Sequence, residues 1–362
     1  MIQQGSLQAL NGQEQHYISM MDEFDVERAL KNMNKASKVI SAVQKLFPNY
    51  FMVYYKLALY YKQMGDSLNA LRNLRIASHL CITAAERDSQ ENKYWESILY
   101  AFECSSSGQM DVAEIYYKKA IDILPNRMEA YFRYGLALGS QKKYQEAIPM
   151  FEKAKTCVEE ECESTEPTPC SCESSSAAYK LALCAENIGW SLAHQEKDEE
   201  AIVYYDEAVR IYPNFVLFYE NRFYANKTRS KFQDAIDDCQ AAIDLTEDVK
   251  LKARLMCMAA TVYAQVQRHE LACKTCLTAL ELDPTLHNAY FELVALPPYL
   301  NNFEMSLELM NVGLSKIEDF NSRYWLLYRR AHIFENLGRL TEAEADKKAM
   351  KKILRLANDR ID

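Results

Sequence analysis

One short text recurs along the chain and constrains its fold more than any other feature. Residues 108–126 read GQMDVAEIYYKKAIDILPN, and close variants begin at Lys142, Glu196 and Gln267. Each copy carries apolar residues at the spacing of an amphipathic helix. A chain that repeats one helical text builds the same unit several times and stacks the copies, because a single short helix cannot bury its apolar face alone.

A 34-residue frame aligns the copies when a recurring proline stands at place 32. The prolines that fix this frame are Pro48, Pro125, Pro213 and Pro284. Alanine then occupies place 20 in eight of nine units, with Ser306 as the exception. Place 27 is alanine in six units, and place 8 is small in six. These small side chains indicate two helices per unit that approach closely, since larger residues there would overpack.

Turn and stop signals agree with this frame. Glycine marks a turn in the middle of the unit at Gly65, Gly108 and Gly338. The proline at place 32 ends the second helix, because it cannot continue the hydrogen-bond ladder and restricts the residue before it. Each unit is therefore predicted to be a helix, a tight turn and a second helix.

The aligned pattern resembles the tetratricopeptide repeat, whose unit is a pair of antiparallel helices, here called A and B. The resemblance runs from residue 17 to residue 357. It implies an all-α fold, a right-handed superhelical solenoid of about nine units with a concave groove. The expected units begin near Tyr17, Phe51, Tyr94, Met128, Ala182, Val216, Ala253, His287 and Tyr324.

Five segments follow from the frame. The first unit is degenerate, with Glu23 and Phe24 where small and apolar residues are usual, and Pro297 and Pro298 interrupt helix A of the eighth unit. We expect an N-terminal tail over 1–16, units 1–4 over 17–161, an insertion over 162–181, units 5–9 with a charged C-terminal cap over 182–357, and a tail over 358–362.

The interruption after the fourth unit reads CVEEECESTEPTPCSC over residues 157–172. It is acidic and nearly free of large apolar residues, so we interpret it as a solvated, mobile loop. Its four cysteines, Cys157, Cys162, Cys170 and Cys172, lack the paired C-x2-C spacing of a zinc site. A metal-responsive or phosphorylated acidic loop stays open as the alternative.

Composition limits the other function classes. The net charge is −9 and no run of Lys and Arg stands out, so we expect no nucleic-acid partner. No apolar stretch reaches 18 residues, and no signal peptide is recognisable, so we expect no membrane span. The eleven cysteines, an odd number, favour a reducing compartment, the cytoplasm or alternatively the nucleus.

Catalytic motifs are missing from the sequence. It has no phosphate-binding glycine loop, no G-x-S-x-G and no H-E-x-x-H, and no two of its six histidines stand at a metal-ligand spacing on one helix. The repeats also consume the chain and leave no room for a catalytic domain. We therefore expect a protein that is not an enzyme and needs no cofactor.

The resemblance also implies where a partner binds, because helix A lines the groove with places 2, 5, 6, 9, 12 and 13. Aromatic and arginine side chains at such places are favoured as binding hot spots. An alternative is that some of them are core. The candidate groove residues are Tyr55, Trp95, Phe102, Phe132, Arg133, Trp190, Asn221, Tyr224 and Arg254. Other residues at these places are Leu136, Glu186, Asn187, Trp325 and Tyr328.

The predicted function is therefore that of a scaffold or adaptor, which binds a peptide or helix of a protein partner in the groove. A chaperone-tail carboxylate clamp is one alternative: Asn221 and Arg254 match it, whereas Glu186, Trp190 and Met258 stand where other polar residues are needed. A sensor that closes on a short ligand and a self-assembling structural subunit are further alternatives.

Overall fold

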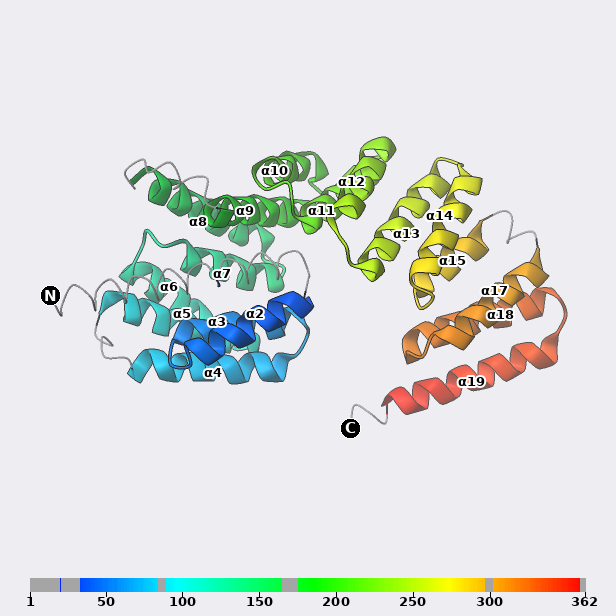
Figure 1. Cartoon of the computed structure of the whole chain (residues 1–362), viewed down its shortest axis with the longest axis horizontal. Coiled ribbons are helices and arrows are strands. Elements are labelled where there is room, and N and C mark those ends of the chain that lie inside the picture. Colours follow the sequence, from blue (N-terminus) through cyan, green and yellow to red (C-terminus); the bar gives the residue numbers. More distant parts are fainter. Residues whose placement is uncertain (1–19, 21–32, 84–88, 165–174, 297–301, 359–362) are drawn as a thin grey trace. The chain divides into compact units, whose positions relative to one another are not determined.

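The computed structural model of the chain describes residues 20, 33–83, 89–164, 175–296 and 302–358. Every regular element in these ranges is an α-helix (Figure 1). The chain divides into two compact units, residues 1–218 and 219–362, with the boundary inside one helix. Each is a solenoid of antiparallel helix pairs, as the repeats predict.

The first unit contains the predicted repeats two to five as four helix pairs, preceded by α2, the B helix of the first repeat. Its helices are α2 (Met33–Leu46), α3 (Phe51–Gln63), α4 (Ser67–Thr83), α5 (Gln90–Ser106), α6 (Met110–Ile123), α7 (Met128–Ser140), α8 (Tyr144–Ser164), α9 (Ser175–Ala193) and α10 (Asp198–Ile211). Glu23 and Phe24, which marked the first repeat as degenerate, lie outside the described residues.

The second unit continues with repeats six to nine. Its helices are α11 (Val216–Thr228), which spans the boundary, α12 (Phe232–Leu245), α13 (Val249–Gln265), α14 (His269–Leu282), α15 (His287–Ala295), α17 (Phe303–Lys316), α18 (Phe320–Asn336) and α19 (Leu340–Asn358). Helix α15 ends two residues before Pro297, which itself lies outside the described residues. The A helix of the eighth repeat is thus short, because the residue before a proline is pushed away from helical backbone angles.

The turn between helices A and B has one geometry throughout the described repeats. Place 15 has a positive φ in all seven repeats where it is described, between 58° and 81°. Three of these residues are the predicted glycines. The other four are Lys142, Glu196, Ser230 and Gln267, which adopt the left-handed region although they carry a side chain. The repeat therefore imposes this turn even where the sequence lacks its glycine.

The predicted helix ends and close helix contacts are confirmed. Helices α2, α6, α10 and α14 each end two residues before the proline at place 32. All eight alanines at place 20 are buried. A Cβ at Gly135 would lie 2.8 Å from the Phe151 ring, and one at Gly189 would lie 2.9 Å from the Tyr205 ring. Place 8 is therefore small because the B helix of the same repeat lies directly against it.

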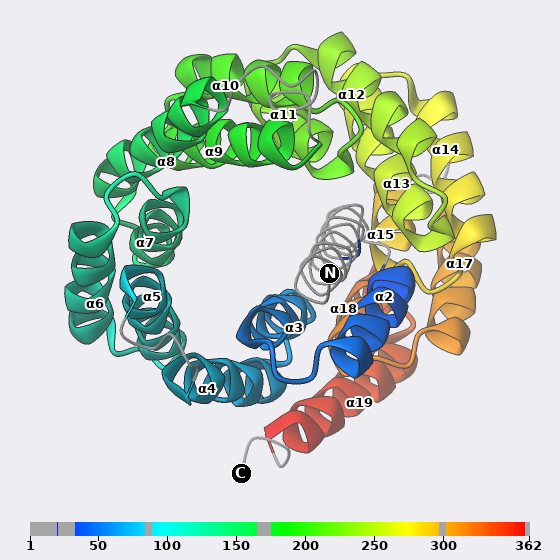
Figure 2. The same cartoon turned by 60° about the vertical axis from the view of Figure 1, so that its left-hand side comes forward.

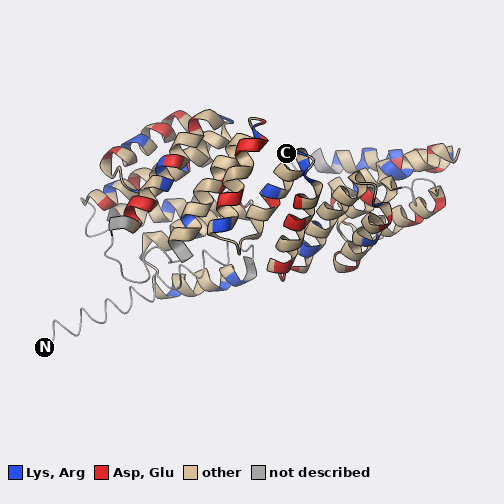
Figure 3. Ribbon diagram, turned by 90° about the horizontal axis from the view of Figure 1, so that it is seen from above, with Lys and Arg blue, Asp and Glu red and all other residues tan. Residues whose placement is uncertain are grey.

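Within the first unit, the A helices line one side of the curved stack. Figure 2 shows α3, α5, α7 and α9 on the inner side and α4, α6, α8 and α10 on the outer side. Residues at groove places, which belong to A helices, are thereby gathered on the inner face of this unit. Acidic and basic residues are interspersed along the helices of both units (Figure 3).

The segment after the fourth repeat is more helical than we expected. Helix α8 continues to Ser164 and α9 already begins at Ser175, so both helices extend into the segment predicted as an insertion. Cys157 is buried and Cys162 is half-buried on α8, whereas Cys170 and Cys172 lie outside the described residues. The A helix of the fifth repeat is consequently 19 residues long, longer than the repeat requires. In the described part of the chain, no helix has the length and apolar character that crossing a bilayer demands.

Candidate functional site

A cavity of about 540 Å³ opens on the inner face of the first unit. Helices α7 and α9 supply most of its wall. It is lined by Phe132, Arg133, Leu136, Gly139 and Ser140 of α7, by Tyr179, Leu183, Glu186, Asn187 and Trp190 of α9, and by Gln63, Phe151, Phe215 and Leu217. Its size is that of a site for one or a few side chains.

The indole of Trp190 forms a fixed part of this wall. Its ring lies 5.4 Å from the Tyr144 ring and 4.1 Å from the His194 ring, measured between centroids. A Cβ at Gly139 would lie 3.2 Å from the indole, so this glycine leaves room for it. Trp190 remains half-buried. A large aromatic surface is therefore held rigidly at the cavity without being covered by the protein.

Phe132 forms the part of the wall that merges with the core. Only 7% of it is exposed, and its ring meets the Phe151 ring edge-on with centroids 5.6 Å apart. Phe132 is thus a core residue that also borders the cavity. The sequence left both roles open for the aromatic candidates, and this side chain combines them.

Arg133 is anchored from one edge of its guanidinium group. Its Nε donates to the Glu129 carboxylate at 2.7 Å and lies 2.7 Å from the Tyr55 hydroxyl, which donates to the same carboxylate. Its two Nη atoms have no hydrogen-bond acceptor among the described residues. Arg133 therefore lines the cavity with a fixed guanidinium whose outer edge is unused.

The charges of this cluster stabilise one another. Burial alone would raise the pKa of Glu129, but the Arg133 charge and the Tyr55 hydrogen bond overcome it and hold that pKa at about 2. Burial raises the pKa of Tyr55 well above its usual range. The Arg133 pKa is raised further, because the neighbouring Tyr55 and Glu129 outweigh the cost of its burial. At neutral pH the cluster is a Glu129–Arg133 ion pair that shares a neutral tyrosine.

Two further candidates, Tyr55 of this cluster and the neighbouring Phe102, are core residues. Tyr55 is 1% exposed and Phe102 is 3% exposed, and their rings meet edge-on at 6.2 Å. The Arg133 guanidinium lies 5.4 Å from the Tyr55 ring and 5.5 Å from the Phe102 ring. Trp95 is half-buried among the rings of Phe51 and Tyr55, and its indole N–H donates to Glu91. These aromatics support the site, and Trp95 stands apart from the cavity.

Polar groups on α9 complete the wall. Glu186 is 6% exposed and accepts a hydrogen bond of 2.7 Å from the Asn187 amide, which also donates to the Leu183 carbonyl at 2.8 Å. The side-chain oxygen of Asn187 has no donor among the described residues. The cavity thus offers a positioned hydrogen-bond acceptor beside its apolar wall.

The remaining candidates belong to the second unit and form a different arrangement. Arg254 donates through one Nη to Glu220 and through the other to the Met258 sulfur. Tyr224 is 53% exposed and its hydroxyl points to the same sulfur. Asn221 is half-buried and follows Glu220 directly in α11. The basic residue required by the chaperone-tail clamp is therefore already neutralised by a buried glutamate.

Exposed aromatics also occur at the end of the second unit. Trp325 is 47% exposed and Tyr328 is 45% exposed on α18, with ring centroids 5.8 Å apart. Both stand at groove places, as the sequence indicated. Among the described residues, the ring contacts of Trp325 and Tyr328 are with residues of the same helix, so they form a stripe along α18.

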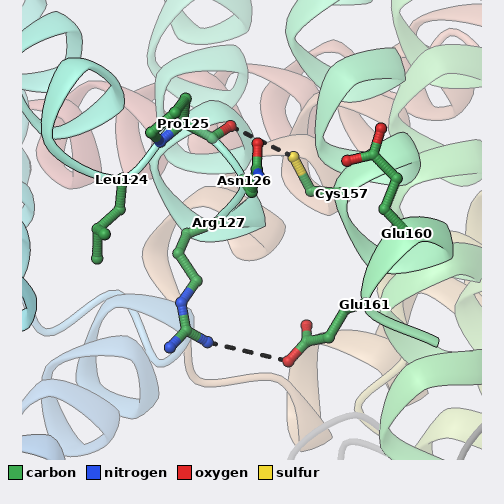
Figure 4. Close-up of a pocket in the computed structure, with 7 residues that line it drawn as sticks. All are labelled: Leu124, Pro125, Asn126, Arg127, Cys157, Glu160 and Glu161. Carbon is green, nitrogen blue, oxygen red and sulfur yellow. Dashed lines mark hydrogen bonds and ion pairs between the residues drawn. The ribbon is translucent and has the colours of Figure 1, made fainter. Parts of the chain in front are cut away.

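A second cavity of about 410 Å³ lies between the α6–α7 turn and α8 (Figure 4). Arg127 reaches Glu91 at 3.3 Å and Glu161 at 3.9 Å, and the Cys157 thiol points to the Pro125 carbonyl at 3.8 Å. Burial raises the pKa of Cys157, so the thiol stays protonated at neutral pH. Arg127, Glu161 and Cys157 thus each have a partner within the chain. No cluster of metal-ligating side chains occurs in the ranges that the structure describes.

Some residues of the main cavity were missed by the sequence argument. Gln63, Gly139 and Ser140 stand at places 12 and 13, which belong to the groove set, but they are neither aromatic nor basic and so carried no hot-spot signal. Tyr179 precedes the start of the fifth repeat, in the segment assigned to the insertion. The helical spacing of Tyr179, Leu183, Glu186 and Trp190 was the signal that could have placed Tyr179 on the same helix face as the others.

Comparison with known proteins supports the repeat assignment. Family models described as tetratricopeptide repeats match residues 129–156, 253–286 and 181–212. The first and third of these ranges contain α7 and most of α9, which form the cavity. A comparison with curated proteins found no match.

Solved structures with a similar fold include larger and smaller helical arrays. The Cut9–Hcn1 hetero-tetramer of APC/C matches with a TM-score of 0.54 and 12% identity over 86% of this chain and 55% of that chain. YrrB, described as a TPR protein with an unusual peptide-binding site, matches with a TM-score of 0.42 and 21% identity, over 57% of this chain and 95% of that chain. PilF of Pseudomonas aeruginosa matches with a TM-score of 0.45 and 17% identity, over 66% of this chain and 94% of that chain. This chain spans about half the length of the matched Cut9–Hcn1 chain. At these low sequence identities, the similarity concerns the fold alone.

Proposed function

We propose that this chain, which is a tetratricopeptide repeat protein, is a non-enzymatic scaffold that binds an extended peptide segment of a protein partner in the α7–α9 cavity. The observation that carries the proposal is the cavity itself. It combines the exposed part of the Trp190 indole with the unused edge of Arg133 and the unused acceptor of Asn187. Rigid aromatic and arginine side chains in a hollow are typical of binding hot spots.

The kind of ligand follows from the wall. Leu136, Leu183 and Trp190 offer apolar contact for one large side chain. The Asn187 oxygen can accept a hydrogen bond from a peptide N–H, which an extended segment leaves unpaired. The cavity volume of about 540 Å³ suits one or two side chains and excludes a folded domain.

The titratable groups of the wall support binding rather than catalysis. They are Arg133, Glu186 and Tyr179, and the first two are fixed by hydrogen bonds to their neighbours. An activated nucleophile requires a base within hydrogen-bond reach. The Arg133 guanidinium cannot act as that base, and the Glu186 carboxylate accepts a hydrogen bond from Asn187. The wall therefore provides contacts, and its chemistry is recognition.

The test uses a random-peptide selection on the full chain, followed by affinity measurement with variants. Leu136→Glu places a charge in the cavity wall, and Val203→Glu makes the same kind of change on α10, where the side chain is 65% exposed. We expect selected peptides to bind wild type and Val203→Glu equally and Leu136→Glu at least ~10-fold more weakly. Circular dichroism checks that both variants fold. Equal binding to a folded Leu136→Glu protein would reject the cavity as the site.

A further inference from the structure

Two cations, one from α3 and one from α7, lie over the same aromatic ring beside the cavity. Lys62 and Arg133 both lie over the Phe102 ring, at 4.4 Å and 5.5 Å from its centroid. Glu129 balances Arg133, and Glu103 is already paired with Arg75 at 2.8 Å.

Lys62 is the cation without a carboxylate. Its amino group reaches the Ser106 hydroxyl at 3.5 Å and the face of the Phe102 ring, and no carboxylate pairs with it among the described residues. Partial desolvation and then the charge of Arg133 lower the pKa of Lys62 to about 8. Arg133 is therefore close enough to Lys62 for the two charges to repel each other, and an anion that reaches both would relieve this repulsion.

Arg133 supplies the other half of this arrangement. Its Nε edge is committed to Glu129 and Tyr55, which leaves the Nη atoms as paired donors of fixed orientation. A guanidinium edge with two parallel N–H donors matches the two oxygens of a carboxylate. The residue next to Lys62 along the chain, Gln63, lines the same cavity as Arg133.

We propose that Lys62 and Arg133 together bind the carboxylate of an acidic side chain in the partner peptide, next to a large apolar side chain that enters the α7–α9 cavity. This inference rests on the proposed function and adds the chemistry of the partner. The acid binds at the α3 side of the cavity, because the buried Glu186 on α9 repels a carboxylate at the other side. The partner is thus an extended segment with Asp or Glu near a Leu, Phe or similar residue.

A pair of small probes isolates the charge. 3-Phenylpropionate and 3-phenylpropanamide have the same shape, and only the first carries a carboxylate. Binding of each to the full chain is measured by ligand-observed NMR at pH 7. We expect the carboxylate to bind at least ~10-fold more tightly than the amide, since a charge-assisted pair contributes about 1.5–3 kcal/mol.

The variant Lys62→Met removes one cation while keeping the apolar stem over Phe102. We expect it to lower carboxylate affinity at least ~5-fold and to leave amide affinity unchanged. The matched control is Lys227→Met, at the same repeat place in the second unit, where the amino group lies 5.9 Å from the Phe223 ring and bonds to Thr261. This control should bind both probes as wild type does.

Each other outcome is decisive. Equal affinity for the two probes would overturn the carboxylate site and leave the cavity as an apolar peptide site. A carboxylate preference that persists in Lys62→Met would overturn the role of Lys62. If neither probe binds at millimolar concentration while a selected peptide does, the carboxylate site is overturned and the proposed function stands. If no selected peptide binds either, the proposed function fails with this inference.

Discussion

Each compact unit has an arginine at a groove place that is paired with a glutamate, but the two pairs leave different atoms available. In the first unit, Arg133 is held through Nε and keeps both Nη atoms unbonded within the described chain. In the second unit, Arg254 uses one Nη for Glu220 and the other for Met258. Arg254 is nevertheless the more exposed side chain, at 39% against 14%.

The difference shows that exposure alone is a poor guide to a binding arginine. What matters is which edge of the guanidinium the protein has already used. Arg133 is buried, fixed and open along one edge, so an anion gains two oriented donors without ordering the side chain. Arg254 must first give up its internal partners. The predictions below separate these two situations.

The largest difference should appear when each arginine is removed. Arg133→Met leaves the mostly buried Glu129 carboxylate, which is 22% exposed, without its cation, and this should cost about 3 kcal/mol in the free energy of unfolding. Arg254→Met removes a partly exposed pair and should cost about 1 kcal/mol or less. Urea unfolding of both variants measures this. Equal losses would show that the two pairs are energetically alike.

Low pH should destabilise the protein through the same Glu129–Arg133 cluster. The Glu129 pKa is about 2 in the folded chain, below the usual value near 4.5. A carboxylate whose pKa is lower in the folded chain than in the unfolded chain stabilises the fold at any pH above its unfolded pKa. This stabilisation is lost as the pH falls towards the folded pKa. We expect wild type to lose about 3 kcal/mol more than Glu129→Gln between pH 5 and pH 2. Parallel stability curves for the two proteins would contradict the assigned pKa.

Removal of one hydroxyl should have a smaller effect. Tyr55→Phe deletes the donor to Glu129 and should cost about 1.5–3 kcal/mol, because the bond is partly buried and its acceptor is charged. Tyr224→Phe deletes a hydroxyl whose contact is a sulfur at 3.9 Å on an exposed ring, and it should cost about 0.5 kcal/mol or less. Thermal unfolding of the pair checks the order, which a larger loss in Tyr224→Phe would reverse.

The smallest expected effect is on the pH dependence of carboxylate binding. With the Lys62 pKa at about 8, raising the pH through 8 removes the proton that attracts the probe. We expect 3-phenylpropionate affinity to fall a few-fold from pH 7 to pH 9 and the amide affinity to stay constant. The Lys62→Met protein should lack this dependence. A carboxylate affinity that stays constant in wild type would exclude Lys62 titration at the site.

The repeat frame made the fold predictable, because alanine at place 20 and proline at place 32 are demanded by packing inside each unit. The site was less predictable for two physical reasons. First, Tyr55 and Phe102 stand at groove places, as Trp190 does, yet contacts between successive repeats bury them. The sequence of a single repeat does not reveal such contacts. Second, the start of α9 was hidden by an acidic segment, so Tyr179 was assigned to a loop.

The most direct test of the central claim is to map a bound peptide on the full chain by NMR of labelled methyl groups. We expect a selected peptide to shift the methyl signals of Leu136 and Leu183, which line the cavity, and to leave those of Val203 on α10 and Met258 beside Arg254 unchanged. Shifts centred on Met258, with Leu136 and Leu183 unaffected, would place binding in the second unit and rule out the α7–α9 cavity.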